Sequence, residues 1–384
     1  MSYMLLAMYI PPSYAGYTFG DPKTEQGAVT LSGYIRGNFQ EKDYSYAAKD
    51  GKIQFDAVQL KLDYDAKNVF GHFEYRCYQY DRLCDFSTLV DAYVGYKILN
   101  KNSLTVGIQP IPFGPARFWE SSLYGGINNT VGLEDAHNIG ANLHWEFLSS
   151  QTQIDAGYFI HDAGNFFGDS KDAARYTANL VSSDDMAYSN LNEKNMWIAR
   201  ITQDIFPLMN NHLNMKAGAS YWYSEIENKS NHQDGNRNAW SIFGILTYDD
   251  FTLNLTGGKT EMKTNDSLST SASKFGSYDS EYLVANDATF YTADVSYQFK
   301  DLIEGVNLRP YFMHSSYLKE PSQFKNSQRN IIGLGIDYKN ISLISEYILS
   351  KNDPFIGGGL NSLAEGDVDQ HTNKLLNFTL FYHF

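Results

Sequence analysis

The feature that most constrains this chain is the alternation of apolar and polar residues in short segments. Every second residue from Leu376 to Phe384 is apolar, and residues 212–223 repeat the pattern. Successive side chains of a β-strand point to opposite faces, so this pattern predicts strands with one apolar face. We find sixteen such segments of roughly 9 to 12 residues, the length that crosses a bilayer when the strand is tilted.

The order of these segments predicts one closed antiparallel sheet. Sixteen is an even number, as bacterial barrels require, and the connections alternate between short turns and long loops. This is the topology of a transmembrane β-barrel with short periplasmic turns, long external loops and both termini in the periplasm. The strands are expected to begin near Gly27, Lys52, Val69, Leu89, Ser103, Asn138, Thr152, Asn195, His212, Asn238, Phe251, Ala288, Val306, Arg329, Ile341 and Lys374. The short turns are expected at 65–68, 99–102, 148–151, 249–250, 300–305 and 339–340, and the long loops at 40–51, 111–137, 161–194, 225–237, 262–287 and 351–373.

Length and hydropathy agree with a single all-β domain over residues 16–384. A soluble chain of 384 residues would usually divide into domains, but no linker or change of composition divides this one. No run of eighteen apolar residues is present, which excludes transmembrane helices. The apolar stretch 4–10, followed by small residues before Gly16, predicts that residues 1–15 are the remnant of a signal peptide; an ordinary N-terminus is the alternative.

Aromatic residues flank the short turns, as in the interfacial girdle of a membrane barrel. The chain ends on Phe384 after alternating aromatics, which resembles the terminal signature of outer-membrane porins. Residues 333–347, with a tight turn at 339–340, and residues 307–311 resemble the last strands of general porins, while residues 107–114 resemble a segment of phosphate-selective porins. The Pro-Glu-Phe-Gly-Gly sequence common in general porins is absent, so the subfamily stays open.

The long loop 111–137 is the expected constriction. A sixteen-stranded barrel is too wide to select small solutes unless something narrows it, and the resemblance implies that this third loop folds into the barrel. It carries Arg117, Glu120, Glu134 and Asp135. The alternative is an exposed loop with solvated charges.

Alternation also assigns a set of basic residues to the lumen, because a charge facing lipid would be costly. A basic wall opposite an acidic loop would create a transverse electric field that discriminates between cations and anions. The open alternative is that lumen acids neutralise these bases in a structural network. The assigned bases are Arg76 and Arg200, nearest mid-height, with Arg36, Lys61, Lys216 and Arg309.

Cys77 and Cys84 are the only cysteines, and they flank the short second external loop. Both are expected on the lipid-facing phase at a hairpin end, and the periplasm is oxidising, so a disulfide is predicted. Two free thiols are the alternative. In trimeric porins the second external loop is a latch onto the neighbouring subunit, and the shortness of this one puts that latch in doubt.

Composition and motifs exclude other functions. The net charge of −14 argues against a nucleic-acid partner. His144 and Asp155 make no nucleophile motif, so an enzyme is not expected. No cofactor and no metal site is expected, and the acids at 184–185 and 365–369 are predicted to be solvated.

The sequence therefore predicts passive diffusion of ions and small polar solutes through a water-filled pore. The resemblance implies a homotrimer surrounded by outer-membrane lipid and lipopolysaccharide. One alternative is a porin selective for sugars or organic acids, and another is a blocked barrel that serves as receptor or adhesin. The selective porin would use a stacking track of Tyr34, Tyr78, Tyr93, Tyr311 and Trp222.

Overall fold

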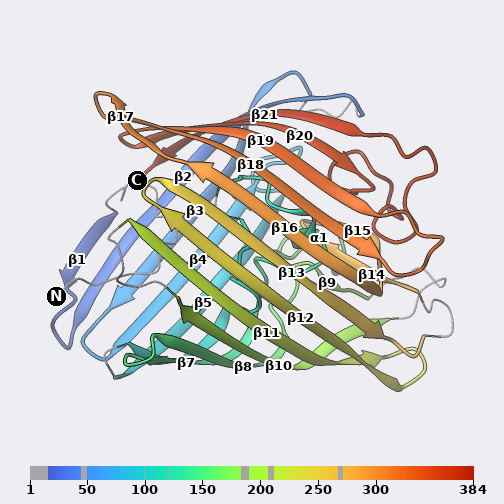
Figure 1. Cartoon of the computed structure of the whole chain (residues 1–384), viewed down its shortest axis with the longest axis horizontal. Coiled ribbons are helices and arrows are strands. Elements are labelled where there is room, and N and C mark those ends of the chain that lie inside the picture. Colours follow the sequence, from blue (N-terminus) through green and yellow to red (C-terminus); the bar gives the residue numbers. More distant parts are fainter. Residues whose placement is uncertain are drawn as a thin grey trace.

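The computed structural model describes residues 16–44, 50–99, 101–119, 121–182, 190–205, 212–266 and 271–384. The expected signal-peptide segment 1–15, the acids at 184–185 and Glu120 lie outside these residues. Within them, sixteen antiparallel strands form a closed barrel, because β2 pairs with β3 on one edge and with β21 on the other (Figure 1). The barrel strands are β2 Gly27–Lys42, β3 Ile53–Asp65, β4 Val69–Tyr78, β5 Phe86–Leu99, β6 Asn102–Pro110, β7 His137–Phe147, β8 Thr152–Asp162, β10 Leu191–Asp204, β11 Leu213–Asn228, β12 Gln233–Tyr248, β13 Phe251–Lys263, β16 Asp287–Tyr297, β18 Val306–Lys319, β19 Ser327–Tyr338, β20 Ile341–Lys351 and β21 Asn373–His383.

Short elements complete the fold. The strands β1 Tyr17–Asp21 and β17 Phe299–Ile303 pair with β2 and β18. A separate small sheet is formed by β9 Asn179–Leu180, β14 Ala272–Ser277 and β15 Ser280–Ala285. The helix α1, Ile127–Thr130, is one turn long. None of the helices in the described part of the chain is long and apolar enough to cross a membrane.

The polarity of the barrel is inverted relative to a soluble protein. On β21, Leu380 and Tyr382 are more than half exposed on the outer face, whereas Asn377 and Thr379 are buried on the inner face. A soluble protein buries its apolar side chains, so an exposed apolar outer face indicates contact with lipid. Aromatic residues beside the short turns are exposed on the same outer face, where a girdle is expected: Tyr96, Phe147, Tyr248, Tyr297, Phe299, Tyr338 and Tyr382.

Six predicted strand starts coincide with the observed ones, and the all-β barrel prediction is confirmed. The predicted long loop 225–237 is wrong, because β11 and β12 pair as far as Asn228 and Gln233. Residues 224–228 are mostly polar, since this end of the hairpin no longer has to present an apolar face. The predicted loop 262–287 instead contains the β14–β15 hairpin.

Parts of the long loops are buried against the inner wall of the barrel. Ile111, Phe113 and Phe118 of the third loop are buried in one apolar cluster with Trp222 and Phe290 of the barrel wall. The same cluster includes residues of the small sheet and of the last long loop, namely Leu180, Phe275, Tyr282, Val284 and Leu363. The third loop, the small sheet and the last long loop therefore form one packed unit.

Candidate pore and constriction site

Inward-facing hydroxyl groups hold the third loop, residues 111–136, against the barrel wall. The backbone N–H of Gly114 donates to Ser220 Oγ of β11 at 2.8 Å. The backbone N–H of Ile127 donates to Ser315 Oγ of β18, also at 2.8 Å. Small polar side chains on the inner face thus satisfy a backbone that has no sheet partner of its own.

A buried arginine provides the first anchor of this loop. Arg329 of β19 forms an ion pair with Asp353 at 2.7–2.8 Å, and both side chains are almost fully buried. The Nη1 atom of Arg329 also donates to the backbone oxygens of residues 124, 125 and 126, at 3.1–3.3 Å. One guanidinium therefore joins the third loop to the loop that follows β20.

A second buried arginine anchors the loop directly after α1. Arg237 of β12 pairs with Glu193 of β10 at 3.3 Å and donates to the backbone oxygen of Val131 at 3.4 Å. Its guanidinium lies 4.5 Å from the ring centre of Trp222, a cation–π contact. Arg237 thus makes an ion pair, a hydrogen bond to the loop and a contact with an aromatic ring.

Most of the predicted lumen bases are paired with carboxylates of the wall. The geometry matches the alternative of a neutralising network more closely than that of unpaired basic residues opposed to an acidic loop. Arg309 is buried on β18. The pairs are Arg36–Asp56 at 2.5 Å, Lys61–Glu74 at 3.4 Å, Arg76–Glu74 at 2.5 Å, Arg200–Asp155 at 2.8 Å and Lys216–Asp204 at 3.6 Å.

The three described loop charges differ in exposure. Arg117 has 53% of its side chain exposed, and its Nε lies 3.9 Å from Asp135. Burial would raise the pKa of Asp135, but Arg117 and His137 outweigh burial and lower it, so this carboxylate is ionised. Glu134 is only 1% exposed, and burial raises its pKa well above the usual value. Glu134 therefore adds no exposed negative charge to the loop.

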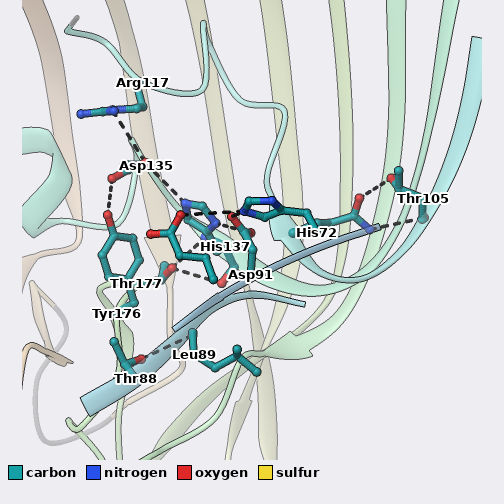
Figure 2. Close-up of polar contacts among 12 residues, drawn as sticks. His72, Thr88, Leu89, Asp91, Thr105, Arg117, Asp135, His137, Tyr176 and Thr177 are labelled. Carbon is teal, nitrogen blue, oxygen red and sulfur yellow. Dashed lines mark hydrogen bonds and ion pairs between the residues drawn. The ribbon is translucent and has the colours of Figure 1, made fainter. Parts of the chain in front are cut away.

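Sequence reasoning missed a connected polar cluster between the wall and the loop (Figure 2). Tyr176 of the fourth loop donates to Asp135 at 2.5 Å and accepts from Arg76 at 3.2 Å. His137 contacts Asp135 at 3.4 Å and Asp91 at 2.8 Å. Strand alternation could have indicated the wall residues, but no local pattern brings Tyr176 to them.

The aromatic residues proposed as a stacking track lie in different surroundings, and Tyr93 packs against His72 with their ring centres 5.7 Å apart. Tyr34 and Tyr78 lie around the Arg36 guanidinium, at 5.7 and 5.6 Å. Trp222 is buried against Phe113 of the third loop. Tyr311 is also buried, and its hydroxyl donates to Glu346. The track is therefore broken where the loop covers the wall.

A disulfide joins Cys77 and Cys84, whose Cα atoms lie 5.0 Å apart. Cys77 lies in β4, but Cys84 lies in the turn before β5 with a positive φ of 59°, so the expectation that both occupy strand positions is wrong. We expect the folded protein to resist labelling by a thiol reagent until it is reduced, because both cysteines of the sequence are in the disulfide. Labelling followed by mass measurement checks this, and ready labelling without reductant would contradict it.

Solved structures of outer-membrane porins and channels share the fold of this closed barrel. No protein-family model and no curated protein matches the chain. Among solved structures, the outer membrane channel DcaP of Acinetobacter baumannii is similar with a TM-score of 0.63 and 14% identity, over 96% of this chain and 100% of that one. OmpF of Salmonella typhi, solved with daunomycin, has a TM-score of 0.61 and 12% identity over 96% and 100%. An anion-selective porin from Comamonas acidovorans has a TM-score of 0.53 and 10% identity over 93% and 100%. At these identities the likeness is one of fold.

Proposed function

We propose that this chain is a porin-type channel of the bacterial outer membrane, through which ions and small polar solutes diffuse passively. The observation that carries the proposal is the inverted polarity of a closed barrel, with an apolar outer face and a polar inner wall. Such a barrel is stable in lipid because every strand edge is paired and the apolar face meets hydrocarbon. The porins and channels of the same fold, described above, support the same function.

The proposed constriction is the third loop, residues 111–136, against the wall formed by β3 to β5. The loop is fixed on the opposite wall by Ser220, Ser315 and Arg329, so its charged end near Arg117 faces the strands that carry Lys61 and Arg76. Paired charges along such a gap favour weak ion selectivity, set by the few charges that keep solvent contact. Small polar solutes are the proposed substrates, and no cofactor is needed.

Single-channel recording in a planar bilayer under a salt gradient tests this function. We expect discrete conductance steps and a small reversal potential from folded protein. Silence from protein that migrates as a folded barrel would overturn the proposal. The assembly proposed with this function, a homotrimer among outer-membrane lipids and lipopolysaccharide, is checked by native mass measurement in detergent.

Arg117 is the residue for which we expect the clearest change in selectivity. Arg117→Glu places a carboxylate on the exposed part of the loop, beside Asp135, and should change the cation-to-anion permeability ratio several-fold toward cations. The matched control is Arg82→Glu, which makes the same charge change in the exposed turn between β4 and β5. Equal shifts in both variants would mean that Arg117 does not lie at the constriction.

A second candidate is a barrel that acts mainly as a surface receptor or adhesin. The specific observation in its favour is the single buried cluster that joins the third loop to Phe275, Tyr282 and Leu363 of the external loops. Such packing could close the external mouth. The same bilayer recording separates the two functions, since a closed barrel stays silent.

A further inference from the structure

Three potential metal ligands converge on the inner wall beside the constriction. His72 and Glu74 lie two residues apart on β4, and strand alternation places their side chains on the same face. Asp91 of β5 is the direct cross-strand partner of Glu74. One nitrogen and two carboxylate oxygens from these residues lie within 4.8 Å of one another. Figure 2 shows His72 and Asp91 pointing toward each other.

The separations fit a shared ion better than direct hydrogen bonds. His72 Nε2 lies 3.8 Å from Glu74 Oε2 and 3.9 Å from Asp91 Oδ2, beyond the hydrogen-bond range. In a tetrahedral site, nitrogen and oxygen ligands that lie about 2.1 Å from zinc are about 3.4 Å apart. The two measured distances exceed this spacing by about 0.5 Å or less, a difference that a small side-chain rotation would close.

Each of the three residues is oriented by a partner at its other polar atom. Asp63 contacts Nδ1 of His72 at 2.5 Å, which leaves Nε2 directed at the carboxylates. His137 contacts Oδ1 of Asp91 at 2.8 Å, and Gln59 donates to Oε1 of Glu74 at 2.6 Å. A carboxylate–histidine pair of this kind is the usual support of a histidine ligand. The support is arranged so that Nε2, Oδ2 and Oε2 face one point.

The carboxylates around the candidate site are shared with several basic groups. Four carboxylates, those of Asp63, Glu74, Asp91 and Asp135, meet the permanent cations of Lys61, Arg76 and Arg117 and the imidazoles of His72 and His137, so a bound ion takes the place of the proton on Nε2 of His72. The group that competes directly is the Lys61 ammonium, 3.4 Å from Glu74 Oε2. Its side chain is 35% exposed, so it can turn toward solvent when an ion binds.

We propose that His72, Glu74 and Asp91 bind one divalent transition-metal ion of the zinc class on the wall of the barrel lumen. One imidazole nitrogen and two carboxylate oxygens are a ligand set that zinc accepts, and three protein ligands leave a position for water. The ion lies next to the cluster of Arg76, Tyr176 and Asp135, so its charge adds to the field at the proposed constriction.

Titration of the folded full chain in detergent with ZnCl2, followed by calorimetry, tests the site. We expect one ion per chain with micromolar affinity. His72→Ala and Asp91→Asn should each weaken binding by about 100-fold or more, and Asp63→Asn, which removes only the orienting partner, by about 10-fold or more. The matched control is His144→Ala, which removes another histidine that is paired with a wall carboxylate, Asp155, and should leave the affinity unchanged.

Absence of zinc binding by the parent chain, or equal affinity in His72→Ala, would overturn the proposal. Electrophoretic migration of unheated samples shows which variants fold. If His72→Ala or Asp91→Asn does not fold, Asp63→Asn still tests the site, because it changes only the orienting partner of His72. Binding is measured without current, so a silent barrel that binds zinc would contradict the channel function and leave the metal site standing. If the barrel conducts, zinc should also change the conductance of the parent chain and not that of His72→Ala.

Discussion

Replacing Arg329 with methionine is expected to lower the free energy of unfolding by about 3–5 kcal/mol. The substitution removes the partner of Asp353, which is completely buried, and the donor to the backbone oxygens of residues 124–126. A buried charge without its partner is far more costly than the absence of the pair. Urea-dependent folding into lipid vesicles measures the change.

A double variant separates the effect of the unpaired buried charge from the effect of the lost loop contact. The double variant Arg329→Met with Asp353→Leu removes both charges and should recover most of the lost stability. It still lacks the donor to residues 124–126, so the third loop should remain loosened and the conductance should be larger and noisier than in the parent chain. A double variant as unstable as the single one would show that the pair is not the source of the effect.

Arg237→Met is the second change with a large expected effect, also about 3–5 kcal/mol. Glu193 would stay buried with Ser224 as its remaining hydrogen-bond donor, and the loop oxygen of Val131 would lose its contact. Unfolding in urea again measures the loss, with the exposed Arg82→Met as the control for removal of an arginine. A loss of less than about 1 kcal/mol, the value typical of surface pairs, would contradict the assignment of a buried anchor.

The two arginines contact the same loop on either side of α1, which allows a further test. Arg329 contacts the loop before α1, and Arg237 contacts it after α1. If the loop is one packed unit, the two substitutions together should be less harmful than the sum of the single effects. Simple addition would mean that the two contacts stabilise the loop independently of each other.

The sequence by itself determined the barrel. An inward–outward alternation with a period of two is a property of each strand alone, and it places β4, β13 and β20 at their correct first residues. The same alternation predicts that Arg36, Arg76 and Arg200 face the lumen, because lipid on the outer face excludes charge. The predicted start of β12 is wrong, because β11 and β12 extend beyond the apolar part of the outer face and the alternation of apolar and polar residues ends before the strands do.

Only the tertiary structure decided which of these residues act together. Glu134 and Asp135 are neighbours in sequence, yet one is buried and the other meets Arg117, because the loop turns between them against the wall. Arg329 marked only a strand start in the sequence, and it anchors a loop about two hundred residues away. Closure of the barrel brings together inner-face residues and loops that no local period relates. Alternation thus gives the face of each side chain, whereas its partner across the lumen depends on how the whole sheet closes and how the loops pack inside it.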